Sequence, residues 1–140
     1  MLTPLCVMQV VYMVHLHPHQ YVYYNSLIGG LPGAYGKYET DYWGNSYKEA
    51  VNWLEGFILM RNGQAPQGYT VLACSDPLSS DYFFPDFLSW SEDARHADFF
   101  IATTRDNCYK RGPAGVLLHT VKRFEVPLNF IMEIPQRRDP

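Results

Sequence analysis

The sequence predicts a single small α/β domain in which helices pack on a mixed β-sheet. Three patterns predict this fold class: short apolar runs bounded by turn residues, one long segment with helical periodicity, and two alternating segments near the C-terminus. The 140 residues suffice for one hydrophobic core, and no internal repeat divides them. We therefore expect one domain over residues 1–140, with one long helix, short helices and a C-terminal β-hairpin.

The first segment, Leu2–Leu16, is apolar and has two interpretations. It is interrupted by a proline, a glutamine and a histidine, and its length falls short of the roughly 20 residues that cross a bilayer. It is either an ordinary buried helix or strand, which the composition favours, or the end of a membrane helix that begins outside this chain. We expect a globular α/β core over residues 17–134 and a frayed polar tail over residues 135–140.

An aromatic run and a glycine-rich stretch come next. Tyr21–Asn25 (YVYYN) combines β-branched and aromatic residues, which predicts a strand. Gly29, Gly30, Gly33 and Gly36 then predict a loop with unusual backbone angles. Their spacing matches neither GxGxxG nor GxxxxGK[ST], so the stretch does not indicate a nucleotide-binding loop.

The strongest helical signal covers Ser46–Asn62. Ser46 and Glu49 have the spacing of a capping box, in which each side chain accepts a hydrogen bond from a free amide at the helix start. Gly63 follows as the expected C-terminal stop. The predicted buried face, with three- and four-residue spacing, consists of Tyr47, Ala50, Val51, Leu54, Phe57 and Ile58.

The second half of the chain alternates short strands with short helices. Apolar runs between turn residues predict the strands Tyr69–Cys74, Phe87–Trp90 and Asp98–Thr103. Short helices are expected over Leu78–Phe84 and Glu92–His96. The alternating segments Val116–Phe124 and Pro127–Ile134 predict a hairpin around Glu125-Val126.

Charge and cysteine content exclude several classes of protein. Lys and Arg number 11 against 14 Asp and Glu, a net charge of −3, so we expect no nucleic-acid partner. Cys6, Cys74 and Cys108 lack paired spacing and predict neither a disulfide framework nor a zinc site. Cys74 is most simply a small buried residue, although a bridge to Cys108 stays open if the compartment is oxidising.

Carboxylates and aromatic rings are most densely mixed in Tyr38–Gly44 (YETDYWG). Glu39 and Asp41 offer carboxylates, and the rings beside them can stack on a sugar. Carboxylates two residues apart share one strand face too closely for the opposed pair of a glycosidase. In a purely structural interpretation, Asp41 caps backbone amides ahead of the helix while Trp43 packs against it.

Three histidines alternate in HLHPH, at His15, His17 and His19. On an extended segment they would share one face, as half of a metal site. Pro18 disrupts regular pairing there, and neither a cysteine nor a carboxylate stands nearby at ligand spacing. We therefore expect no metal and no cofactor. A free-standing metal-binding protein or enzyme, built on these histidines and Asp41, remains the alternative.

Several long stretches resemble one family. They are HPHQYVYYN (His17–Asn25), the pair Gly29-Gly30, GAYGKYETDYWGNSYKEA (Gly33–Ala50), ADFFIATTR (Ala97–Arg105) and HTVKRFEVPL (His119–Leu128). Together they resemble the C-terminal soluble portion of bacterial membrane glycosyltransferases of the dolichyl-phosphate-mannose protein mannosyltransferase type (glycosyltransferase family 39, GT-C architecture), over about residues 12–134. The chain departs from the family pattern at His15 and His19, where Arg and Tyr are expected.

The resemblance implies a membrane-associated domain on the extracytoplasmic (periplasmic) face of the bacterial inner membrane. Such enzymes hold their catalytic carboxylate in preceding membrane spans, so no catalytic residue carries over to this chain. Leu2–Val14 becomes the end of the last membrane helix. The implied role is accessory: binding a glycan or protein acceptor, or stabilising the membrane-embedded region of a polyprenyl-phosphate-sugar-dependent transferase, in cis or encoded upstream.

Two further possibilities stay open. One is a pure interaction domain whose tyrosines contact the membrane region, and the other is a free-standing carbohydrate-binding protein. If the domain has a ligand surface, we expect it at the aromatic–carboxylate cluster and the residues beside it. The candidate ligand-binding residues are His17, Asn25, Glu39, Asp41, Tyr42 and Trp43.

Overall fold

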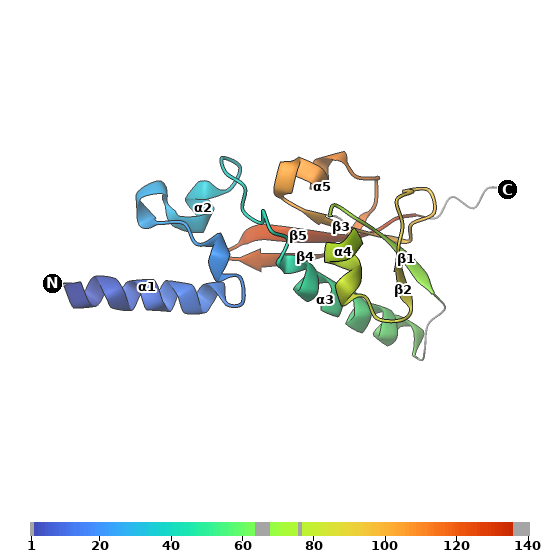
Figure 1. Ribbon diagram of the computed structural model, residues 1–140, viewed down its shortest axis with the longest axis horizontal. Coiled ribbons are helices and arrows are strands. Elements are labelled where there is room, and N and C mark those ends of the chain that lie inside the picture. Colours follow the sequence, from blue (N-terminus) through green and yellow to red (C-terminus); the bar gives the residue numbers. More distant parts are fainter. Residues whose placement is uncertain (1, 64–67, 76, 136–140) are drawn as a thin grey trace.

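A five-stranded mixed sheet runs through the centre of the protein, in the order β2-β1-β3-β5-β4 (Figure 1). The computed structural model describes residues 2–63, 68–75 and 77–135. β1 pairs in parallel with β2 and β3, whereas β5 is antiparallel to both β3 and β4. The strands are β1 (Tyr69–Ala73), β2 (Leu88–Trp90), β3 (Phe99–Thr103), β4 (Val116–Arg123) and β5 (Val126–Glu133). The predicted α/β class, mixed sheet and C-terminal hairpin are confirmed.

The long helix α3 (Ser46–Asn62) covers one face of the sheet and has the predicted bounds. Its face of Tyr47, Ala50, Val51, Leu54 and Ile58 is buried, and Phe57 packs at the edge of the same core. α3 ends at Gly63, which has a left-handed φ of 73°. The apolar periodicity predicted this helix correctly, because a helix that packs on a sheet buries only one of its faces.

The predicted capping box is wrong. The residue before the helix is Asn45, whose side chain makes no capping hydrogen bond, and Ser46 is the first helical residue. The Ser46 hydroxyl donates instead to the carboxylate of Asp41. Glu49 pairs with Arg123 on β4. Both side chains therefore have partners far along the chain, which local spacing does not reveal.

The central strand β3 is buried along its whole length, because it is covered on both faces. Phe99 and Ile101 face α3 in the main core. Phe100, on the other face, lies against Gly112, directly after the short helix α5 (Cys108–Arg111). A Cβ added to Gly112 would stand 1.9 Å from the Phe100 ring, so only glycine fits this close approach.

The turn of the hairpin consists of Phe124 and Glu125, one residue earlier than predicted. Both have left-handed backbone angles, with φ of 50° and 60°, as a two-residue type I′ turn requires. Val126 is already in β5 and is buried. The turn lies one residue before the predicted position because Val126 is part of a hydrophobic cluster, which the alternation in the sequence does not reveal.

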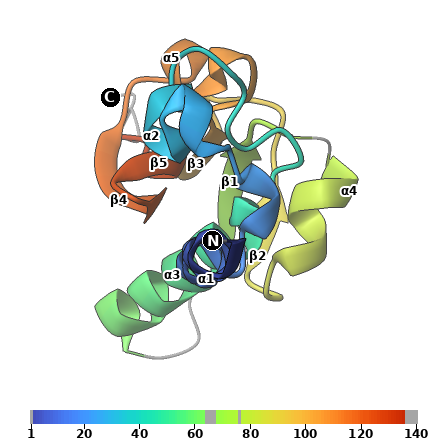
Figure 2. The same cartoon turned by 90° about the vertical axis from the view of Figure 1, so that its left-hand side faces the viewer.

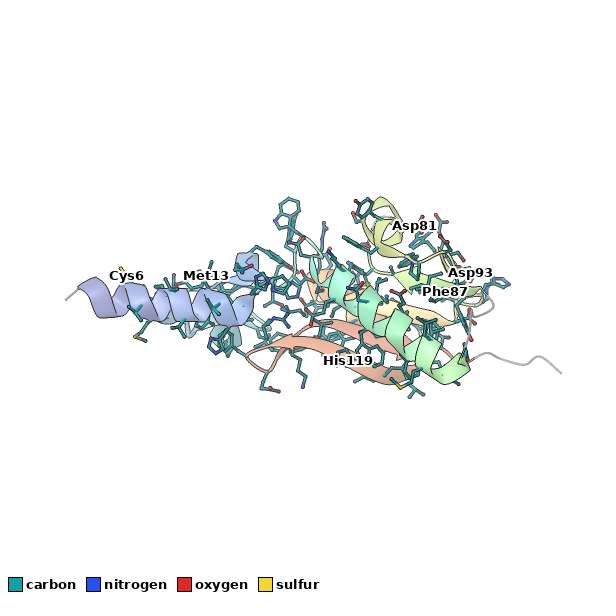
Figure 3. All side chains as sticks on the ribbon, turned by 90° about the horizontal axis from the view of Figure 1, so that it is seen from below. Cys6, Met13, Asp81, Phe87, Asp93 and His119 are labelled. Atoms are coloured by element: carbon teal, nitrogen blue, oxygen red, sulfur yellow. A yellow bond between two sulfur atoms is a disulfide. The ribbon has the colours of Figure 1, made fainter. Side chains whose placement is uncertain are left out.

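The first helix, α1 (Leu2–Leu16), projects from the α/β body (Figure 1) and lies end-on in front of it in Figure 2. Val7, Val10 and Val14 are 61%, 63% and 65% exposed. Cys6 and Met13 lie along the projecting helix, away from the sheet (Figure 3). The expectation of a buried segment is therefore wrong for most of α1. No helix within the described ranges is long and apolar enough to cross a bilayer.

A second, smaller core anchors the end of α1. Leu16, Val22, Leu31, Val126 and Leu128 are buried together there. The flanking segments are η1 (Gln20–Val22), η2 (Ser26–Ile28) and α2 (Gly30–Ala34).

The strand predicted over Tyr21–Asn25 is wrong, because that segment begins in a 3₁₀ turn around the end of α1 and pairs with no strand. Its rings contact different neighbours, since the Tyr23 hydroxyl donates to Gln9 at 2.6 Å and the Tyr24 hydroxyl to the Glu39 carbonyl at 2.5 Å. The glycine-rich stretch has the expected positive φ at Gly29, Gly30 and Gly36. It also contains the short helix α2, which was not predicted.

The remaining connections are short. The helix expected over Leu78–Phe84 is present as α4 (Pro77–Ser80) and η3 (Asp81–Phe83), and η4 (Arg105–Asn107) precedes α5. Glu92–His96 is not a helix, because the Asp93 carboxylate accepts from the Arg95 amide at 2.9 Å and forms a local turn. The tail predicted over residues 135–140 lies, apart from Pro135, outside the described residues.

A disulfide joins Cys74, directly after β1, to Cys108, at the start of α5. From the sequence, a bridge between these two cysteines was possible but was not predicted. Cys6 is a free and exposed cysteine on α1.

Candidate functional site

The structure does not bring the six predicted ligand residues together. Glu39, Asp41, Tyr42 and Trp43 share the loop between α2 and α3, but their side chains reach different surroundings. His17 and Asn25 lie in the turns between α1 and α2.

Asp41 is completely buried beside the start of α3. Its Oδ2 accepts from the Ser46 hydroxyl, whose oxygen accepts from Asn129 Nδ2 on β5 at 3.0 Å. The backbone amides of residues 44–46 also favour the ionised carboxylate. Burial outweighs these contacts and raises the pKa of Asp41 to about 6. The one hydrogen bond to the carboxylate comes from the Ser46 side chain, and Asp41 Oδ1 has no partner within the described residues, so the cap for amides ahead of α3 stays a prediction.

Glu39 and Tyr42 bind the loop that follows β3. The Asp106 amide donates to both carboxylate oxygens of Glu39 at 3.3 Å. The Arg105 guanidinium lies 4.5 Å from the Tyr42 ring centre, and its Nη1 donates to the Tyr42 carbonyl at 3.4 Å. Glu39 also lines a cavity of about 360 Å³. Both side chains thus hold two loops together.

His17 and Asn25 have local structural roles. Gln20 Nε2 donates to His17 Nδ1 at 2.9 Å, and Asn25 Oδ1 accepts from the Leu27 amide at 3.0 Å as the cap of η2. The histidines predicted as half of a metal site are engaged separately, since His15 Nδ1 lies 2.8 Å from the Val11 carbonyl. In the described part of the chain, no three His, Cys, Asp or Glu side chains are placed to hold a metal ion.

Trp43 alone of the six lines a surface groove of about 690 Å³. We call it the Trp43 groove. Its walls come from the turn after α1, the start of α3, and the α4–η3 segment, where Tyr82 faces it. Trp43 is 73% exposed and does not pack against α3, so that part of the structural interpretation is wrong. The polar wall of the groove consists of Asn45, Lys48, Glu49 and Asn52.

At one end of the groove, Glu49 joins three elements. Arg123 on β4 donates to it through Nη2 at 2.6 Å and Nη1 at 3.2 Å, a two-point ion pair. His19 Nε2 lies 2.9 Å from the same carboxylate. Burial would raise the pKa of Glu49, but the hydrogen bonds from Arg123 and His19 outweigh it and lower that pKa. Burial lowers the pKa of His19, which the bond to Glu49 offsets only in part.

Sequence reasoning missed Tyr82, Asn45, Lys48 and Asn52. The last three had a usable signal, since positions 45, 48 and 52 share one face of the α3 helix. Tyr82 had none, because the packing of η3 on α3 brings it to the groove. The arrangement offers two rings and several hydrogen-bonding groups, which suits binding more than covalent chemistry.

Comparisons with known proteins give no relative. No family model, no curated protein and no solved structure matches this chain. The resemblance to glycosyltransferase family 39 therefore stays a prediction from the sequence stretches that carry it.

Proposed function

We propose that this chain is a non-catalytic, extracytoplasmic accessory domain of a polyprenyl-phosphate-sugar-dependent membrane glycosyltransferase, held at the membrane by α1. The observation that carries the proposal is the uncovered apolar surface of α1. Val7, Val10 and Val14 form one exposed row, and Met8, at 68% exposure, adds a second side.

A helix that is apolar on all sides is normally buried in a core or in lipid. α1 has no Asp, Glu, Lys or Arg along its length. Its last turn is held by the second core, while the exposed part projects beyond it. Covering a valine side chain contributes about 1.5–3 kcal/mol relative to leaving it in water. A lipid phase covers such a helix without requiring a complementary protein groove.

Three of the stretches that carry the family resemblance meet where α1 joins the body, namely His17–Asn25, Gly33–Ala50 and His119–Leu128. His19, Glu49 and Arg123 come from three of them and form one network. Phe124, from the same stretch as Arg123, contacts α1 directly. Parts of three of these stretches thus form the joint between α1 and the sheet, which supports the proposal of a domain fixed to a preceding membrane segment.

The disulfide supports the extracytoplasmic location. Bridges such as Cys74–Cys108 form and persist in oxidising compartments and are rare in the cytosol. The accessory role is supported by the engagement of Glu39 and Asp41 in contacts that hold the fold together.

Vesicle flotation tests the membrane contact. The chain should float with vesicles of phosphatidylethanolamine and phosphatidylglycerol, and the double variant Val10→Asp, Val14→Asp should remain at the bottom of the gradient. Met60→Asp is the matched control, because Met60 is 86% exposed but lies near the far end of α3. Equal flotation of all three proteins, or of none, would overturn the membrane contact.

The link to a glycosyltransferase has its own test. Sequencing the DNA upstream of this chain should reveal a multi-span membrane protein, either in frame or as the adjacent gene. An upstream neighbour without membrane spans would contradict the proposed partner and leave the vesicle result unaffected.

A further inference from the structure

We infer that the Trp43 groove is a saccharide-binding site. The first observation is the exposure of its two large rings, since Trp43 is 73% and Tyr82 is 82% exposed. Each ring has one aromatic neighbour in edge-to-face geometry: Tyr42 lies 5.1 Å from Trp43, and Phe83 lies 5.2 Å from Tyr82. Edge-to-face contact holds a ring without covering both of its faces.

The second observation is the polar wall along α3. Asn45, Lys48 and Asn52 are exposed and make no hydrogen bond through their side chains to any other described residue. Their helical spacing places them in one row. The amides of Asn45 and Asn52 both donate and accept, as sugar hydroxyls do, and the Lys48 ammonium between them donates.

The third observation is a buried polar atom on a residue that lines the groove. His19 lines the groove and is only 1% exposed, and its Nε2 is held by Glu49. Its Nδ1 has no hydrogen-bond partner within the described residues. An unpaired buried nitrogen is unfavourable, and a ligand hydroxyl or a water molecule would satisfy it.

The charges of the lining give little support for an anionic ligand. The lining carries one lysine and one glutamate, Lys48 and Glu49, and the pKa of His19 is lowered by burial. Glu49 is already paired with Arg123, so Lys48 is the one uncompensated cation in the described lining, and no second cation stands beside it to clamp a phosphate. Apolar ring faces together with the amides of Asn45 and Asn52 fit a neutral sugar, whose C–H face stacks while its hydroxyls bond. A volume of about 690 Å³ is within the usual range of small-molecule sites.

The test is a titration of the ¹⁵N-labelled full chain with maltose, cellobiose, mannobiose and diacetylchitobiose, followed by NMR. The chain has 3 tryptophans, so each indole N–H is a separate reporter. At least one sugar should shift the Trp43 signal saturably. The Trp53 and Trp90 signals should stay in place, because neither residue lines the groove.

Variants then locate the site by calorimetry. Trp43→Ala and Tyr82→Ala should each weaken binding roughly tenfold, the scale of one lost stacking contact. Asn52→Ala should weaken it through hydrogen bonding alone. Tyr38→Ala is the matched control, because Tyr38 is also exposed but lines a different cavity, and it should leave the affinity unchanged.

Two results would overturn the inference. One is the absence of a saturable Trp43 shift with all four sugars at tens of millimolar. The other is a Trp43 shift with a Ser/Thr-rich peptide and with none of the sugars, which would make the groove a peptide site. The titration contains no vesicles, so its failure leaves the membrane proposal standing.

Discussion

The Phe124 ring, at the tip of the hairpin, stacks on the Tyr12 ring of α1 with centres 4.4 Å apart and planes 18° from parallel. Tyr12 also meets Tyr23 edge-on at 5.6 Å, and its hydroxyl accepts from the Leu31 amide at 2.9 Å. It lies so close to Gly30 that a Cβ there would stand 2.6 Å from its oxygen. Tyr12 thus connects α1 to the hairpin, to the residue directly after η1 and to α2.

Phe124→Ala should loosen α1 without unfolding the sheet. A stacked pair contributes about 0.5–1.5 kcal/mol beyond area burial, so amide exchange in residues 6–16 should accelerate roughly fivefold. Hydrogen–deuterium exchange measures this, with Tyr82→Ala as a ring deletion remote from α1. Unchanged exchange in α1 would show that the stack does not hold the helix.

Glu125→Gly should stabilise the protein by about 0.5 kcal/mol, because Glu125 has a left-handed φ of 60° that glycine adopts without strain. Its exposed ion pair with Lys122, at 3.5 Å, contributes little. Urea unfolding should show Glu125→Ala to be less stable than Glu125→Gly, since alanine removes the same carboxylate and keeps the strain. Equal stability of the two variants would contradict this explanation.

Reducing the Cys74–Cys108 bridge should destabilise the fold. The bridge closes a loop with a sequence separation of 34, for which chain entropy predicts about 3–4 kcal/mol. Urea unfolding with and without reductant measures the loss, and Cys74→Ser with Cys108→Ser should reproduce it. Cys6→Ser, which alters a free cysteine on α1, should change nothing.

The stability of the fold should fall as pH rises through the range in which Asp41 ionises. Burial raises the pKa of Asp41 from 3.8 to about 6, so the folded state binds this proton more tightly than the unfolded chain does. The resulting stability is complete below the unfolded pKa and is lost as pH rises through about 6. The shift corresponds to a loss on the order of 3 kcal/mol.

Asp41→Asn isolates this effect, because an amide stays neutral throughout. The measured quantity is the difference in unfolding free energy between the variant and the wild type from pH 3.5 to 7, a range chosen to span roughly both pKa values. The lowered pKa values of Glu49 and His19 act in the opposite direction, and they cancel in this difference. Asp106→Asn, at an exposed carboxylate, is the control, and its difference in unfolding free energy should not change with pH. If the difference for Asp41→Asn also does not change with pH, the pH dependence does not come from Asp41.

The main helix and most strands could be predicted because burial against a sheet leaves a regular apolar pattern. Ser46–Asn62 is the clearest case, since its regularly spaced apolar residues lie on one helix face and pack into the main core. Tyr21–Asn25 failed because its composition is that of a strand, while its rings pack in different directions around α1. An aromatic and β-branched composition indicates that the rings are partly buried, but it does not indicate which neighbouring segments cover them.

The candidate site was predictable only in part for a similar reason. Trp43 was identified by its place in a dense aromatic segment, and it does line the groove. Asp41 and Ser46 looked local, yet Asn129 on the last strand completes their network. Tyr82 reaches the groove only through the packing of η3, a contact between distant segments that a single sequence does not encode in any short pattern.

Arg123 links the turn directly after α1 to the long helix α3. Its Nε donates to the His17 carbonyl at 3.2 Å, directly after α1, while its other nitrogens hold Glu49 on α3. Glu49 and His19 also line the Trp43 groove. These contacts link the end of the first helix to the lining of the groove. If α1 lies on a membrane surface as proposed, these contacts would set both the height of the groove above that surface and the direction in which it opens.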